Sequence, residues 1–184
     1  ARTVNESSKR YVHADPEMWI SIIGIEKKAG NMTVLKSLLS EAVKECPKSG
    51  ELWSLLVENE PRAARTRSTL NALEICAGDP YLMNVTARIF WLDLKKEKAT
   101  SWFERCLLVK PTLGDTWAFY TLFCEMSNEE VQKKEVIRRC IKAEPNEGRI
   151  WSSIADKPSN WNKSTEQLLT LAVEEARKYF HSIK

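Results

Sequence analysis

PTLGDTW, at residues 111–117, has two partners in the same chain, PKSGELW at residues 47–53 and PNEGRIW at residues 145–151. All three read proline, two free positions, glycine, two further positions and tryptophan. Proline ends the helix before it because it has no N–H to donate. Glycine permits a sharp turn, which we expect to use a positive φ. Tryptophan then enters the next helix and fills the space between helices. The motif predicts a repeated helix–turn–helix.

The spacing of the tryptophans predicts five copies of this unit. They stand at positions 19, 53, 117 and 151, so the gaps are 34, 64 and 34 residues. The double gap indicates a missing member. Met83 supplies it, because the dipeptide Asp-Pro precedes Met83 at the same distance as it precedes Trp19. The slots are then 34, 30, 34 and 34 residues apart, which is the period of a two-helix repeat.

Apolar residues between the slots follow the helical period. We predict first helices at residues 16–29, 49–59, 80–94, 114–126 and 147–156, and second helices at 33–45, 62–77, 97–109 and 128–143. A weak stripe of Leu70, Leu73 and Ala77 marks one second helix, and Ser127-x-x-Glu130 predicts a capping box before another. The six residues predicted to form the repeat core are Trp19, Trp53, Met83, Trp117, Tyr120 and Trp151.

The end of the chain predicts a longer helix over residues 164–183, opened by the capping-box spacing Ser164-x-x-Gln167. Such a helix can cover the last apolar edge of a solenoid. Its predicted inner face comprises Thr165, Leu168, Leu169, Ala172, Val173, Ala176, Phe180 and Ile183. The whole chain, residues 1–184, is therefore predicted to be one all-α domain. We expect a right-handed α-α superhelix with repeats starting near residues 16, 49, 80, 114 and 147. Residues 1–12 are expected to be a frayed end or the tail of a preceding repeat.

Composition excludes several classes of protein. The net charge of +3 is too small to argue for nucleic acid by itself. No apolar stretch approaches the roughly 20 residues of a membrane span, and no secretory signal is evident. Five cysteines, none in a Cys-x-x-Cys pair, lack the spacing of a zinc site and the even number of a disulfide framework. We predict reduced, buried thiols, which are typical of the cytosol or nucleus.

The sequence contains no motif for catalysis. It lacks a glycine-rich phosphate loop, a nucleophile elbow and His-Glu-x-x-His. Its two histidines, His13 and His181, stand at opposite ends of the chain. We therefore predict that the protein is not an enzyme, with no catalytic residue, metal ligand, cofactor or small-molecule substrate.

Two basic clusters are the candidate partner-binding residues. They are Arg62, Arg65 and Arg67 in one predicted helix, and Lys133, Lys134 and Arg138 in another. Acidic neighbours weaken the positive electrostatic field of both clusters. Three interpretations stay open: an ordinary charged surface, contact with acidic protein segments, or direct contact with RNA phosphates.

The first helices depart from the tetratricopeptide pattern, because no glycine follows the tryptophan by four residues. Trp117-Ala-Phe-Tyr120, with Glu125 after it, instead resembles the half-a-tetratricopeptide (HAT) repeat of RNA-processing proteins. Together with Arg88-Ile-Phe-Trp91 and Asn160-Trp161, in this order, it is similar to the C-terminal repeats of the pre-mRNA-processing factor six family.

The resemblance implies a non-enzymatic scaffold in the nucleus. That family bridges U5 and U4/U6 components of the U4/U6.U5 tri-snRNP, so the implied partners are spliceosomal proteins, with those of U4/U6 expected for the C-terminal repeats. Two alternatives stay open: another HAT-repeat RNA-processing scaffold, or a tetratricopeptide-type adaptor that grips the C-terminal carboxylate of a peptide.

Overall fold

The computed structural model describes residues 15–182 of the chain. The expectations for residues 1–12, for His13 and for Ile183 lie outside this range. The described chain divides into two compact units, one up to Leu82 and one from Met83 onward. Each unit consists of α-helices that pack side by side. The predicted all-α helical-repeat fold is confirmed. That residues 1–184 act as a single domain stays a prediction.

The first unit contains two helix pairs. They are α2 (Pro16–Ala29) with α3 (Met32–Glu45), and α4 (Gly50–Asn59) with α5 (Arg62–Ile75). Each helix packs against the next, and α2 also contacts α4. The core between α2, α3 and α4 is aliphatic around one indole, with buried Trp19, Ile23, Leu35, Leu39 and Leu52. Leu73 packs beside a smaller cluster of Ala72, Cys76 and Leu82.

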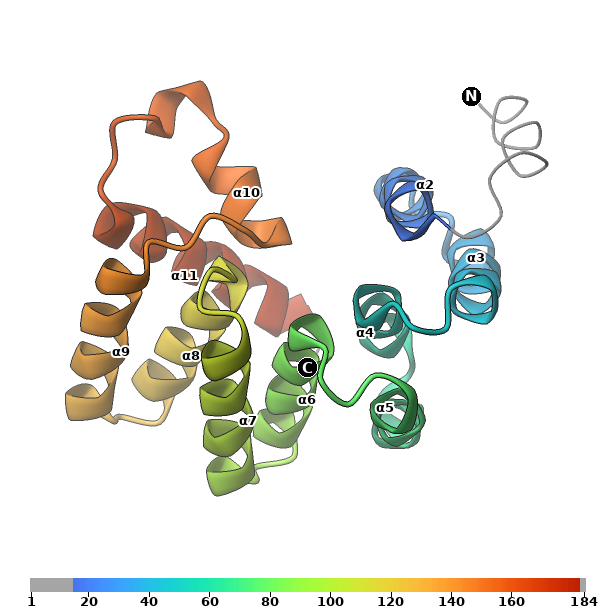
Figure 1. Ribbon diagram of the computed structural model, residues 1–184, viewed down its shortest axis with the longest axis horizontal. Coiled ribbons are helices and arrows are strands. Elements are labelled where there is room, and N and C mark those ends of the chain that lie inside the picture. Colours follow the sequence, from blue (N-terminus) through green and yellow to red (C-terminus); the bar gives the residue numbers. More distant parts are fainter. Residues whose placement is uncertain (1–14, 183–184) are drawn as a thin grey trace. The chain divides into compact units, whose positions relative to one another are not determined.

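The second unit begins within α6 (Pro80–Leu92) and continues through α7 (Lys96–Val109), α8 (Gly114–Met126) and α9 (Glu130–Ala143). The short α10 (Arg149–Ala155), a 3-10 turn (Pro158–Asn160) and α11 (Thr165–Ser182) follow. Every residue of α8 from Gly114 to Cys124 is buried. A helix that is enclosed on all sides lies in the middle of its domain, and α8 contacts α7, α9, α10 and α11 (Figure 1).

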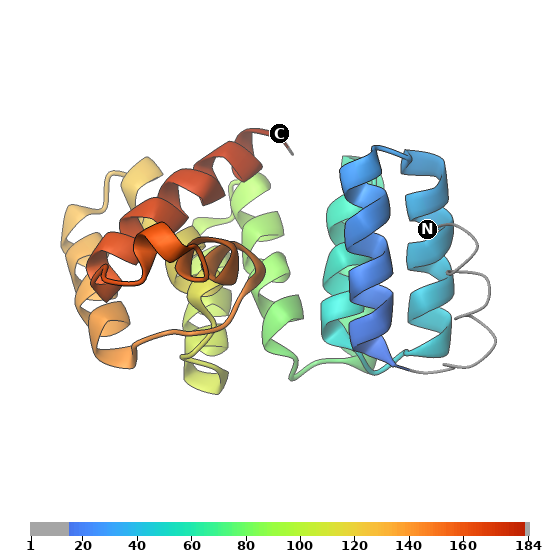
Figure 2. The same cartoon turned by 90° about the horizontal axis from the view of Figure 1, so that it is seen from above.

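Helix α11 lies across the first helices of three successive repeats. It packs against α8 and α10, and near its end Phe180 stacks on Trp91 of α6 with ring centroids 3.8 Å apart. Figure 2 shows α11 crossing this face of the second unit. The predicted inward residues Leu169, Ala172 and Val173 are buried, as are the two later ones, Ala176 and Phe180. In addition to covering the last repeat, α11 therefore covers the face that the first helices of the second unit form.

The ends of the helices follow local sequence. Asp15 accepts the backbone N–H of Glu17 at 3.1 Å, and Asp79 accepts those of Tyr81 and Leu82 at 2.9 and 3.2 Å. These aspartates satisfy donors that the first turn leaves unpaired, so the Asp-Pro dipeptides open α2 and α6 in the same way.

The predicted capping box at Ser164 is confirmed. Ser164 Oγ accepts the N–H of Gln167 at 3.3 Å, and Gln167 Oε1 accepts the N–H of Ser164 at 3.0 Å.

Two local predictions are wrong. No capping box forms at Ser127-x-x-Glu130, because Ser127 still ends α8 and Glu129 precedes α9 without a side-chain cap. Asn128, with φ of 56°, reverses the chain between them. The stripe in α5 is also shifted by one residue: Leu70 is 58% exposed, and Thr69 and Ala72 are buried instead. α5 carries many polar residues, so the spacing of its few apolar residues gave little information about which side of the helix is buried.

Candidate protein-interaction surface

The Pro-x-x-Gly turn holds its own tryptophan by a hydrogen bond. The indole N–H of Trp53 donates to the carbonyl oxygen of Pro47 at 2.8 Å, and that of Trp117 to Pro111 at 2.7 Å. The thiol of Cys76 also lies 3.3 Å from the Pro47 oxygen. A buried indole needs an acceptor for its N–H, and the proline carbonyl six residues earlier provides it. Proline therefore both ends one helix and orients the tryptophan of the next.

The glycines of the motif provide space rather than a special dihedral angle. A Cβ added at Gly50 would lie 2.0 Å from Cγ of Asp79, and one at Gly114 would lie 2.2 Å from Cδ2 of Trp151. Only Gly148 among the three motif glycines has a positive φ, of 124°. The expectation of a positive φ is therefore wrong for Gly50 and Gly114. They are glycines because the following repeat packs directly against the backbone.

Successive copies of the motif interlock through backbone and side chain. The N–H of Gly114 donates to the carbonyl of Glu147 at 2.7 Å, which joins two turns 33 residues apart. The carboxylate of Asp115 then accepts the N–H groups that open α10, those of Arg149, Ile150 and Trp151, at 2.9–3.0 Å. The acidic residue of one motif thus caps the helix of the next.

Burial of Asp115 disfavours its charged form and raises the pKa of this carboxyl. The backbone hydrogen bonds and the nearby charge of Arg149 act in the opposite direction but only partly offset it.

The residues predicted for the repeat core have the following places. Trp19, Met83, Trp117 and Trp151 are buried, and so is Tyr120. Trp53 is half-buried and packs beside the clusters on both sides of α4. Three further aromatic residues of the core, Trp91, Phe119 and Phe123, stand outside the five slots and were not predicted as core residues.

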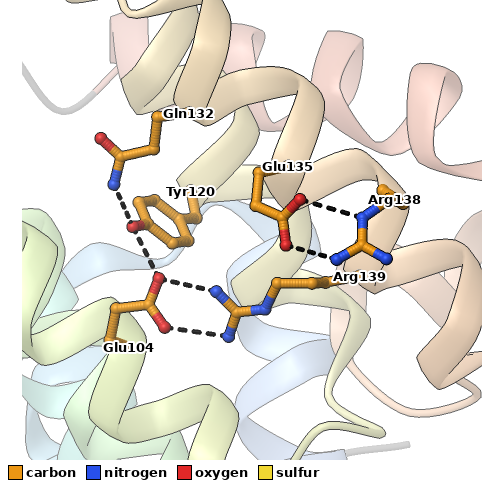
Figure 3. A network of polar contacts seen from close by, with 6 residues as sticks. All are labelled: Glu104, Tyr120, Gln132, Glu135, Arg138 and Arg139. Carbon is orange, nitrogen blue, oxygen red and sulfur yellow. Dashed lines mark hydrogen bonds and ion pairs between the residues drawn. The ribbon is translucent and has the colours of Figure 1, made fainter.

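A polar network joins the three helices around Tyr120 (Figure 3). Its hydroxyl donates to Oε1 of Glu104 at 2.8 Å and accepts from Gln132 at 2.5 Å. Arg139 holds both oxygens of Glu104 at 2.9 Å, the bidentate geometry that arginine favours. Burial opposes the charge of Glu104, but the hydrogen bonds from Arg139 and Tyr120 outweigh it and lower its pKa. The network is half-buried and internally satisfied, so it fixes α7, α8 and α9 relative to one another.

The predicted partner-binding residues are partly engaged within the chain. Lys133 Nζ lies 3.4 Å from Glu125, and Arg138 pairs with Glu135 at 2.7 Å. Arg65 donates to the carbonyl of Glu60 at 3.0 Å.

Arg62, Arg67 and Lys134 are exposed. The two clusters lie in different units, and their role in partner binding stays a prediction.

A surface hollow opens beside this network, at the start of α9. Its wall carries four glutamates, each of which has a basic partner: Glu104 with Arg139, Glu129 with Lys96, Glu130 with Lys133, and Glu135 with Arg138. Charges of both signs therefore balance around the hollow. The hollow therefore has no excess of one charge that would attract an ion or a charged ligand.

Within residues 15–182, no group of three His, Cys, Asp or Glu side chains is placed to hold a metal ion. All five cysteines are buried and free, as predicted. Burial raises the pKa of Cys124 and Cys140 to about 12 in each case, which makes both thiols unreactive. None of the helices in this range is long and apolar enough to cross a membrane.

The stacked helix pairs, and the hydrogen bonds that join their turns, define a helical-repeat protein. The chain is 36% identical over 174 residues to the fission yeast (Schizosaccharomyces pombe) pre-mRNA-splicing factor prp1, a match of 94% of this chain and 19% of that protein. It is 34% identical to human pre-mRNA-processing factor 6 over 65% of this chain and 13% of that protein. It is also 34% identical to the Arabidopsis thaliana protein STABILIZED1, over 64% of this chain and 12% of that protein.

The chain belongs to the pre-mRNA-processing factor 6 family. It spans about a fifth of the length of its fission yeast relative and less of the other two. No family model matches the chain.

Proposed function

We propose that this chain is a protein-interaction scaffold of the splicing machinery, and that it acts in the nucleus as part of a bridge between U5 and U4/U6 components of the tri-snRNP. The observation that carries the proposal is the match of 94% of the chain to a pre-mRNA-splicing factor. The fold supports it, because in the second unit hydrogen bonds join the turn motifs at residues 111–117 and 145–151, which gives the surface of that unit a fixed geometry. Partners held on such a surface meet at a high effective concentration.

The covered face of the second unit favours a scaffold over a tetratricopeptide-type adaptor. Such an adaptor holds a peptide against its first helices, whereas here α11 packs on α8 and α10 and reaches α6 through Phe180. Arg88, which could meet a carboxylate on that face, is buried with its guanidinium carbon 4.3 Å from the ring centroid of Phe119. Partners of the second unit are therefore expected on its outer helices and connections.

The balance of charge favours protein partners over RNA. Phosphate binding needs an excess of basic side chains that release counterions, but Lys133 and Arg138 are matched by glutamates. Filter binding to single-stranded RNA across a salt series tests this directly. We expect weak binding, and an affinity that is high at low salt and falls steeply as salt rises would favour the RNA alternative.

The proposal is tested by affinity capture from nuclear extract with the tagged chain, followed by mass spectrometry for U5 and U4/U6 proteins. A variant with Arg62, Arg67 and Lys134 changed to glutamate tests the predicted basic residues. Its matched control reverses the same number of charges, with glutamate at the exposed Lys36, Lys44 and Lys48. We expect the wild-type chain to enrich tri-snRNP proteins. The first variant should capture less of them, and the control variant should capture as much as the wild type. Recovery of no splicing protein by the wild-type chain would refute the scaffold proposal.

A further inference from the structure

Trp161 is placed unlike the other tryptophans of the described chain. It is 85% exposed, whereas Trp19, Trp91, Trp117 and Trp151 are each 9% exposed or less, and Trp53 and Trp102 are half-buried. An indole offers more apolar area for burial than any other side chain. A protein that leaves one in solvent forgoes that stabilisation, so its exposure requires an explanation.

The connection that carries Trp161 is an ordered loop held by hydrogen bonds. The side-chain amide of Asn160 is buried and donates to the carbonyl of Ile154 at 2.9 Å. The N–H of Asn160 donates to Lys157 at 2.8 Å, and that of Lys163 donates to Asn160 at 3.0 Å. The capping box at Ser164 then starts α11. In Figure 1 this connection extends past the helix ends of the second unit between α10 and α11.

The burial of the neighbouring residues Asn160 and Trp161 is the reverse of what is usual for these residue types. Ordinarily the amide faces water and the indole faces the core. Here Asn160 is 9% exposed and Trp161 is 85% exposed. Because hydrogen bonds on both sides of Trp161 already fix the backbone of the loop, ordering this backbone adds little entropic cost on binding. Tryptophans presented in this way are typical anchors of protein interfaces, since they fill a socket in the partner.

The charges around Trp161 indicate the kind of socket. Asp156 and Lys157 stand before it and Lys163 and Glu166 stand after it, so the two signs cancel. A stacking platform for single-stranded RNA combines its aromatic residues with a basic groove that follows the phosphates, and no excess of basic charge exists here. The balanced charge of this segment therefore favours a protein surface with an apolar pocket over RNA.

We propose that Trp161 is the anchor of a protein-binding surface on the connection between α10 and α11, and that it inserts into an apolar socket of a splicing protein. This inference rests on the proposed function, because it assigns the place where one of the scaffold's partners docks.

The test compares affinity capture from nuclear extract by four forms of the full chain: wild type, Trp161→Ala, Trp161→Phe and Val131→Ala. Val131 is the matched control because it is 86% exposed and apolar but lies on α9. All four should give the same circular dichroism spectrum. We expect Trp161→Ala to reduce capture of at least one identified spliceosomal protein by about tenfold or more, as loss of an interface anchor does. Trp161→Phe should retain part of the capture, and Val131→Ala all of it.

A photo-crosslinking amino acid, p-benzoylphenylalanine, at position 161 identifies what covers the loop. A crosslink to the same spliceosomal protein supports the proposal. Capture of splicing proteins that Trp161→Ala leaves unchanged overturns it while the scaffold function stands. A crosslink to RNA also overturns it, in favour of a stacking site. If the wild-type chain captures no splicing protein, this inference and the proposed function fail together.

Discussion

Replacing Gly114 with alanine tests the interlocking of the repeats most directly. The new Cβ would lie 2.2 Å from Cδ2 and 2.4 Å from Cγ of Trp151, whereas ordinary contact begins at 3.4 Å. The indole and α10 would therefore have to move by about 1.2 Å. Trp151 is only 2% exposed, and its backbone N–H donates to the carboxylate of Asp115 at 2.9 Å. The movement would therefore also weaken the cap of α10.

Overpacking of this kind typically costs about 1–3 kcal/mol. Because the clash is with a rigid buried ring rather than the end of a flexible side chain, we expect the upper end, about 3 kcal/mol. Urea unfolding followed by circular dichroism should show this loss, and the melting temperature should fall by roughly 6 °C or more.

Gly24 provides the matched control. It lies within α2, and a Cβ added there meets nothing within 4 Å. Alanine has the higher helix propensity, so Gly24→Ala should stabilise the protein by about 0.5–1 kcal/mol. The reasoning fails if Gly114→Ala is as stable as the wild type, or if Gly24→Ala loses as much stability as Gly114→Ala.

Three further predictions concern the core and its titrating groups. Trp117→Ala should cost about 3–5 kcal/mol and Met83→Ala less; urea titration measures both, and an unchanged Trp117→Ala would contradict the slot assignment. The lowered pKa of Glu104 means that its charged form stabilises the fold above the ordinary glutamate range and that this contribution is lost as pH falls. Glu104→Gln should therefore lose less stability than the wild type between neutral pH and about pH 3, and an equal loss would argue against the network. Because burial raises the pKa of Cys124 and Cys140 to about 12, neither should react with a thiol reagent at mildly alkaline pH until urea is added, as peptide mapping of the labelled cysteines would show.

The covered face of the second unit also changes where partners should be sought. Repeat proteins commonly bind segments along the face of their first helices, but in this chain Phe180 and its neighbours on α11 already fill that face. Outer helices and connections remain, and among them the loop around Trp161 is the most distinctive.

The repeat and its register could be predicted from the sequence because both depend on short-range chemistry. Proline and glycine end and turn the chain wherever they stand, tryptophan marks the slot that follows, and an amphipathic stripe such as that of α11 sets which face is buried. The helices α2, α4 and α8 accordingly begin and end within two residues of their predicted bounds. Where the pattern was polar, as around Leu70 in α5, the predicted phase was wrong by one residue.

The sequence by itself determined the places of the turns, the tryptophan slots and the period of the chain, because each turn motif is a short run of neighbouring residues and the motif recurs along the sequence. Only the tertiary structure decided why Gly114 must lack a side chain, which helix Asp115 caps, that α11 lies on the first helices, and that Trp161 stays in solvent. Those features depend on atoms about 30 or more residues apart, or on which neighbouring side chain enters the core. Local propensity carries no information about such contacts, because they exist only when packed surfaces meet.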